Sequence, residues 1–122
     1  MPVVDPLKRQ LTDTKVNSLL QAWELLRTQH REIPAQAVTV LLYIASHNPC
    51  HKQSIEEDQG LSTASCSRMV DFLSSNDSRP NIKGNGLGLV EKYTDPSNGR
   101  RFLLRLTVQG EMFTQQIKDT VC

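Results

Sequence analysis

The sequence is poor in cysteine and in aromatic residues, and neither sign of charge dominates. Its three cysteines form no Cys-x-x-Cys pair, so the sequence indicates neither a disulfide framework nor a zinc ribbon. Lys and Arg number 14 against 13 Asp and Glu, and a net charge of +1 by itself indicates nothing about nucleic acid. The apolar runs are short, and the first ten residues carry charges without an apolar stretch, which argues against a membrane span and a signal peptide. We therefore expect a cytoplasmic protein with reduced thiols and no contact with membranes.

What remains is the composition of one ordinary globular domain. Apolar residues make up 38% of the chain and charged residues 22%, and 122 residues can bury one hydrophobic core. We expect a single domain over residues 1–122, with no metal and no cofactor. Between Ser62 and Gly110 seven basic residues stand against four acidic ones, whereas the segment from His51 to Leu61 is net acidic. Positive charge thus gathers in the second half of the chain, although ordinary solvated surfaces also show such an imbalance.

Apolar residues at helical spacing predict two helices in the first half of the chain. The first covers residues 13–29, and the second runs from Pro34 to about His47. In the second helix the apolar positions occupy most sides, so we expect it to be buried. The apolar stripe of the first helix consists of Val16, Leu19, Leu20, Trp23 and Leu26.

Two further helices are predicted on either side of a tight turn. A short polar helix spans His51 to about Gln59, and Gly60 is suited to its C-terminal cap. Ser62 is suited to the N-cap of a second helix, which extends through Ser74. Two helices joined by so short a turn containing glycine are typical of a helix-turn-helix, whose second helix enters the major groove of DNA.

The last third of the chain predicts a loop, a hairpin and a helix. Residues 75–88 are rich in Asn, Ser, Pro and Gly and indicate a loop. Strands are predicted at 89–94 and 102–106, joined by turn-forming residues at 95–100. Thr107 then caps a final helix. The predicted apolar side of this helix consists of Val108, Met112, Phe113 and Ile117.

This order of elements is that of a winged helix-turn-helix. The predicted fold class is mostly α with a small β-hairpin, an α+β arrangement, and we call the hairpin at 89–106 the wing. Residues 33–106 form the predicted DNA-binding core. The helices at 13–29 and 107–121 flank this core and form the predicted dimerisation part.

Four segments form an ordered set of motifs. They are Gly-Leu-Ser-Thr-Ala-Ser-Cys-Ser-Arg-Met-Val-Asp-Phe-Leu at 60–73, Gly-Leu-Val-Glu-Lys at 88–92, Asp-Pro-Ser-Asn-Gly-Arg-Arg at 95–101 and Leu-Thr-Val-Gln-Gly at 106–110. Together they resemble the MarR family of bacterial regulators. The resemblance covers about residues 33–115, in order and at the family's spacing. It implies a homodimer that binds a pseudo-palindromic DNA operator, usually as a repressor and often released by a small-molecule effector.

The resemblance also implies which residues touch DNA. Arginine can bond guanine O6 and N7 in bidentate fashion, and serines can bond phosphates or base edges. In the wing, Ser97 and Asn98 replace charged residues of the family pattern, so the minor-groove contact falls to Arg100 or Arg101. Asp95 is expected to hold the wing turn. The predicted DNA-binding residues are Thr63, Ser65, Ser67, Arg68, Lys92, Arg100 and Arg101.

Dimerisation is expected through the first and last helices. The chain has one helix after the wing, whereas typical family members carry a further helix that builds the dimer. A single winged helix still leaves its first and last helices in need of a partner. The predicted dimer interface consists of Leu19, Trp23, Leu26, Phe113 and Ile117.

Two residues of the second helix of the predicted helix-turn-helix, which we call the recognition helix, are considered for functions other than DNA binding. Cys66 lies at core spacing and is expected to be a small buried apolar residue rather than a redox centre. Phe72 occupies an outward position where the family has a polar or basic residue. It either packs under the loop, through Ile82 or Leu87, or serves as an exposed contact for a partner.

The sequence therefore predicts a sequence-specific regulator that binds double-stranded DNA, and not an enzyme. No histidine stands at an interpretable spacing from a nucleophile and an orienting acid, so no catalytic residue is predicted. One alternative is a winged helix that has become a protein-interaction module. The other is a replication or plasmid initiation protein, which would bind DNA through the same residues.

Overall fold

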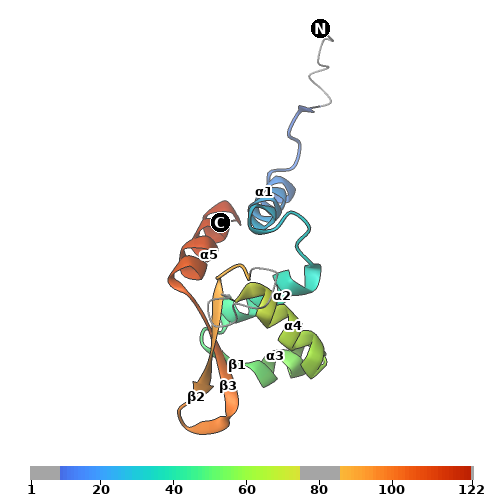
Figure 1. The fold of residues 1–122 in the computed structure, drawn as a ribbon. Coiled ribbons are helices and arrows are strands. Elements are labelled where there is room, and N and C mark those ends of the chain that lie inside the picture. The colour runs from blue at the N-terminus through green and yellow to red at the C-terminus, as the bar shows by residue number, and fades with distance from the viewer. Residues whose placement is uncertain (1–8, 75–85, 122) are drawn as a thin grey trace.

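The computed structural model describes residues 9–74 and 86–121, which fold into five helices and three short strands. The α1–α5 end and the wing end lie at opposite extremes of the molecule, with α2, α3 and α4 between them (Figure 1). None of the described helices is long and apolar enough to cross a bilayer. The elements are α1 (Thr14–Gln29), α2 (Ala35–Ser46), β1 (Cys50–His51), α3 (Lys52–Gln59), α4 (Thr63–Leu73), β2 (Val90–Asp95), β3 (Asn98–Leu106) and α5 (Val108–Val121).

The helix ends follow local capping rules. The carboxylate of Asp13 accepts hydrogen bonds from the backbone N–H groups of Lys15 and Val16 at 3.1 and 3.0 Å, which fixes the start of α1. Pro34 is the N-cap of α2 in extended conformation, one residue before the helical turn in which it was expected. Gly60 closes α3 at φ 64°, a left-handed conformation that glycine adopts without strain. All five predicted helices are confirmed.

The predicted wing is confirmed, and the sheet holds one more strand than expected. The order is β1-β3-β2, and both pairings are antiparallel. β1 has only two residues, with Cys50 opposite Leu104 and His51 opposite Leu103. A two-residue strand leaves no periodicity to detect, so it was not predicted. Most of the predicted loop at 75–88, including Ile82, lies outside the described residues.

One hydrophobic core connects the helices and the sheet. The second helix is buried on most sides as predicted, because Val40 and Ile44 are as inaccessible as the core-facing positions, but Leu42, which was expected toward the core, is 41% exposed. Cys66 is fully buried, as expected for an apolar role. On α5 the prediction is half right, because Phe113 and Ile117 are buried whereas Val108 and Met112 are 75% and 67% exposed. The largest fully buried side chains include Leu41, Ile44, Ile55, Leu73, Leu89 and Leu104.

The motif at 106–110 joins the wing to α5. The hydroxyl of Thr107 donates to the carbonyl of Gly88 at 2.6 Å and accepts from the N–H of Gly110 at 3.0 Å. A Cβ atom on Gly110 would lie 1.9 Å from the carbonyl oxygen of Leu89, closer than atoms can approach. Only glycine therefore allows α5 to begin so close to the residue that precedes β2.

Candidate nucleic-acid interface

The recognition helix α4 is fixed at its start and along its inner face. The hydroxyl of Ser62 accepts a hydrogen bond from the backbone N–H of Ser65 at 3.0 Å, which confirms the predicted N-cap. Cys66, Val70 and Leu73 are buried, so the opposite side of the helix faces outward. α4 thus packs against the core and exposes one polar arc to solvent.

The four predicted DNA-binding residues of α4 differ in their exposure to solvent. Thr63 and Arg68 are exposed, and Ser65 and Ser67 are half-buried. The guanidinium of Arg68 donates to the hydroxyl of Ser65 at 3.1 Å and has no carboxylate partner among the described residues. Its positive charge is therefore available to an anionic or polar ligand, and Ser65 helps to orient it.

Thr63 is part of a network that sequence reasoning missed. Its hydroxyl donates to one carboxylate oxygen of Glu56 at 3.0 Å, and the ammonium group of Lys52 donates to the other at 2.5 Å. The hydrogen bond from Lys52, followed by that from Thr63, lowers the pKa of Glu56, although partial burial opposes the shift. The network ties α3 to the first residue of α4. The signal was present as a Lys–Glu pair at i, i+4 spacing in α3.

Asp95 holds the wing turn, as predicted. One of its oxygens accepts from the backbone N–H and the hydroxyl of Ser97 at 2.9 and 2.7 Å. The other lies 3.0 Å from Nε2 of His51. The hydrogen bond with His51, followed by those with Ser97, lowers the pKa of Asp95 to about 2. The contact with His51 joins residues 44 positions apart and was not predicted, because it depends on the pairing of β1 with β3.

The basic residues of the wing fall into two groups. Arg105 is paired with Glu91 and lies 4.3 Å from the ring centre of Tyr93. The ammonium group of Lys92 lies 4.7 Å from the ring centre of Phe102, a cation–π contact that leaves it exposed. The second group consists of two arginines without such partners. Arg100 and Arg101 are exposed and make no ion pair within the described part of the chain.

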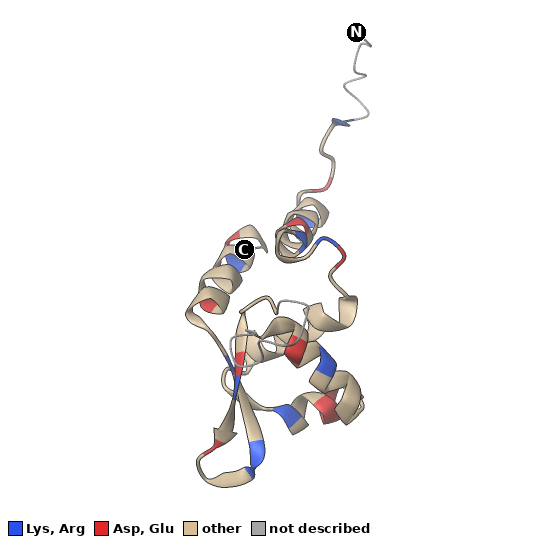
Figure 2. Ribbon diagram, in the orientation of Figure 1, with Lys and Arg blue, Asp and Glu red and all other residues tan. Residues whose placement is uncertain are grey.

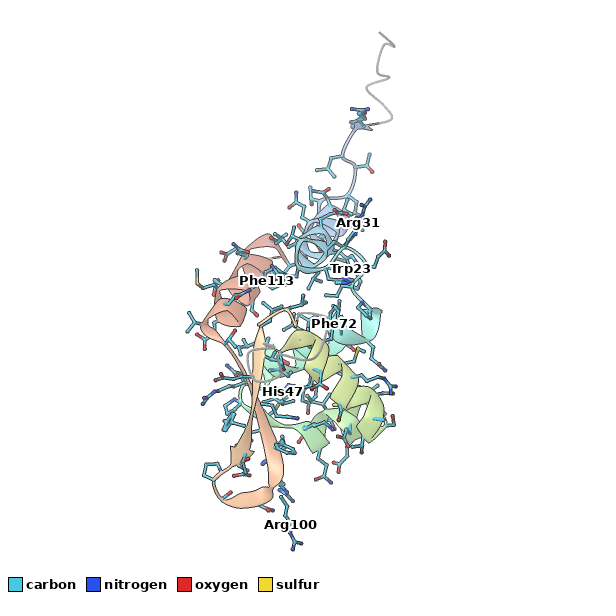
Figure 3. All side chains as sticks on the ribbon, in the orientation of Figure 1. Trp23, Arg31, His47, Phe72, Arg100 and Phe113 are labelled. Carbon is cyan, nitrogen blue, oxygen red and sulfur yellow. The ribbon has the colours of Figure 1, made fainter. Side chains whose placement is uncertain are left out.

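The predicted DNA-binding residues come from α4 and from both strands of the wing, β2 and β3, at the end of the molecule away from α1 and α5. Figure 2 shows blue Lys and Arg positions on α3, α4 and the wing at this end. Arg100 projects from the tip of the wing, away from the body of the protein (Figure 3). The recognition helix and the wing thus both expose cationic side chains to solvent.

The predicted dimer residues separate into an exposed and a buried set. Leu19 and Trp23 are 63% and 46% exposed. Leu26, Phe113 and Ile117 are buried in the core of their own chain, where α1 and α5 pack together. A side chain enclosed by its own chain is not available to a partner, so the accessible apolar surface of α1 differs from the predicted one. It consists of Val16, Leu19, Leu20 and Trp23.

Phe72 has an intramolecular explanation. It is half-buried, and its ring lies edge-on to that of His30, with ring centres 5.1 Å apart. The carbonyl oxygen of Phe72 accepts from the N–H of Leu87 at 3.0 Å. The residue therefore packs between the end of α1 and the segment before β2, and gives no support to an exposed aromatic contact.

The described residues contain no group of three or more His, Cys, Asp or Glu side chains arranged to hold a metal. Cys50 and Cys66 are buried free thiols, and burial is the main reason that their pKa values are raised, that of Cys50 to about 11. Neither thiol is placed as a reactive nucleophile.

The fold is that of solved MarR-type transcriptional regulators. The PcaV regulator of Streptomyces coelicolor in complex with its natural ligand is 25% identical and superposes with a TM-score of 0.56, covering 99% of this chain and 78% of that one. Rv1404 of Mycobacterium tuberculosis is 20% identical, with a TM-score of 0.61 and coverages of 98% and 78%. A MarR mutant from E. coli complexed with operator DNA is 20% identical, with a TM-score of 0.57 and coverages of 87% and 69%. No protein-family model and no curated protein matches the sequence significantly.

Proposed function

We propose, from the MarR-type winged-helix fold that this chain shares with solved regulators, that it is a sequence-specific regulator of transcription that binds double-stranded DNA and acts as a repressor. The observation that carries the proposal is the placement of Arg68 on α4 and of Arg100 and Arg101 on the wing. All three are exposed and lack carboxylate partners within the described residues. A MarR mutant and AbfR, which have the same fold, were solved bound to DNA.

In the proposed complex α4 enters the major groove and the wing reaches the adjacent minor groove or its phosphates. Arg68 reads a guanine, because a guanidinium can donate to O6 and N7 together. Thr63 and Ser67 lie beside it on the same helix. The hydroxyl proton of Thr63 is already given to Glu56, so Thr63 contributes to DNA as an acceptor or through its methyl group.

The wing supplies affinity more than discrimination. Arg100 and Arg101 meet the concentrated negative potential of the duplex backbone, and Lys92 adds a contact from the neighbouring strand. Such contacts position the protein and are insensitive to base sequence. Binding is therefore expected to weaken steeply with salt.

A homodimer is the proposed assembly. α1 exposes four apolar side chains in one stripe, which is more than an isolated surface helix normally leaves to water. A two-fold dimer through this stripe would present two copies of α4 to successive turns of the major groove. A small-molecule effector that releases DNA remains part of the prediction, and the PcaV regulator of the same fold was solved with its natural ligand.

The experiment that tests the function is a selection from a pool of random duplex DNA at two salt concentrations. Enrichment of an inverted repeat with half-sites about 10 base pairs apart would support a dimeric operator-binding regulator. Salt-sensitive retention without enrichment would contradict sequence specificity. No retention at low salt would contradict DNA binding and favour a protein-interaction module. Enriched sites that map to repeated origin elements instead of promoters would favour an initiator.

A further inference from the structure

A small hollow lies between α3 and the wing. Its volume is about 130 Å³, whereas a single water needs only roughly 10–15 Å³. It can therefore hold a group larger than one water molecule. One wall comes from β1 and α3, and the other comes from the first residues of β3. The residues that carry the argument are His51, Gln53 and Glu56 on the first wall, and Arg100 and Arg101 on the second.

The charges around the hollow do not cancel. Its acidic residue, Glu56, has both oxygens occupied, one by Thr63 and one by Lys52. Arg100 and Arg101 have no such partner within residues 9–74 and 86–121. The wing side of the hollow therefore carries two uncompensated positive charges, with Arg100 at its outer edge where the wing ends, and a negatively charged ligand would compensate them.

Two polar side chains complete the lining. The imidazole of His51 is fixed by its contact with Asp95 at 3.0 Å, and the ring is partly exposed. The side-chain amide of Gln53 is exposed and donates to Glu57 at 3.1 Å, which leaves it a second N–H group. Two guanidinium groups with an amide nearby suit an oxyanion such as a phosphate better than an apolar ligand.

We propose that this hollow binds one backbone phosphate of the DNA duplex, held by Arg100 and Arg101 from the wing and by Gln53 from α3. The inference rests on the DNA-binding function proposed above and adds α3 to the interface. In a helix-turn-helix the first helix crosses the sugar-phosphate backbone while the second lies in the major groove. A phosphate between α3 and the wing would fix the protein's position on the duplex without reading a base.

The test places a negative charge in the hollow. Gln53→Glu introduces a carboxylate that pairs with the wing arginines and repels a phosphate. Loss of one phosphate contact lowers the salt slope of log K by about 0.9, which corresponds to roughly eightfold weaker binding at 0.1 M salt. The loss is the same for every duplex sequence. The matched control is Gln21→Glu, which makes the same charge change at an exposed position of α1, at the opposite end of the molecule.

Gln53→Lys provides the opposite change and is expected to tighten binding and steepen the salt slope. If Gln53→Glu and Gln21→Glu bind DNA equally well, the inference is wrong while the proposed function stands. If the wild-type chain retains no duplex at low salt, both are wrong. Inorganic phosphate, compared with chloride at equal ionic strength, tests whether DNA occupies the hollow. Stronger competition by phosphate against the wild type than against Gln53→Glu would support the backbone contact, because a free anion displaces DNA only from a site that DNA occupies. Equal competition against the two proteins would contradict it.

Discussion

The two ends of this molecule expose different kinds of surface. At the wing end Arg68, Arg100 and Arg101 are exposed without carboxylate partners in the described chain. At the α1–α5 end the exposed side chains include Leu19 and Met112, which are 63% and 67% accessible. A charged surface attracts a polyanion, whereas an apolar surface gains from contact with another apolar surface. The fold thus places the charged surface and the apolar surface apart, and the proposed function uses each for a different partner.

The largest effect is expected from a substitution at Gly110, where the wing joins α5. Gly110→Ala places a Cβ against the carbonyl of Leu89, so α5 must shift from the wing, and we expect the free energy of unfolding to fall by about 3 kcal/mol. Urea denaturation measures it. The control is Gly99→Ala, because a Cβ there meets nothing within 4 Å. Equal stability of the two variants would contradict the tight junction.

Charge on the apolar end is expected to break the dimer. Leu19→Glu puts a carboxylate into the proposed interface, and we expect the dimer to weaken by about 2.5 kcal/mol, roughly 70-fold. Sedimentation velocity measures the change. Gln21→Glu is the control, since two residues along a helix it lies nearly opposite to Leu19. A Leu19→Glu variant that dimerises as the wild type does would show that this stripe is not the interface.

Removal of one arginine at the charged end is expected to separate specificity from affinity. Arg68→Ala should cost about 2 kcal/mol, roughly 30-fold, on the selected operator and little on unrelated DNA. Arg100→Ala should weaken all sequences alike, by roughly eightfold at 0.1 M salt, and lower the salt slope by about 0.9. Fluorescence anisotropy with both duplexes measures the two effects. Identical behaviour of the two variants would refute the division of roles between α4 and the wing.

The smallest effect is expected from pH at the wing turn. Because hydrogen bonds in the folded state lower the pKa of Asp95 to about 2, its contribution to stability is fully present above about pH 4 and is lost as pH falls to 2. Asp95→Asn should therefore be less stable than the wild type at pH 7. The difference should shrink between pH 4 and pH 2 in urea denaturation. A difference that does not change with pH would contradict this role for the Asp95 carboxylate.

Predictions from the sequence succeeded where structure is local. Gly60, Ser62 and Thr107 each cap a helix through contacts within a few residues, so their roles followed from residue type and spacing. Of the candidate site, Arg68, Arg100 and Arg101 lie exposed where they were expected. Their contacts with DNA remain predictions.

The sequence could not show which apolar residues are covered by the chain itself. Leu19 and Leu26 belong to one helical stripe, yet the first is exposed and the second is buried. The difference depends on where α5 packs, which periodicity in α1 does not contain. For the same reason Phe113 was assigned to a partner although it completes the protein's own core.

The amino-acid sequence by itself determined five helices, a wing and a helix-turn-helix, because caps, turn residues and apolar periodicity act over a few residues. Only the tertiary structure decided that His51 meets Asp95, that Glu56 joins Lys52 to Thr63, and that a hollow forms beside Arg100 and Arg101. These arrangements require segments distant in the chain to meet. Their positions follow from packing of the whole core rather than from the properties of any single residue.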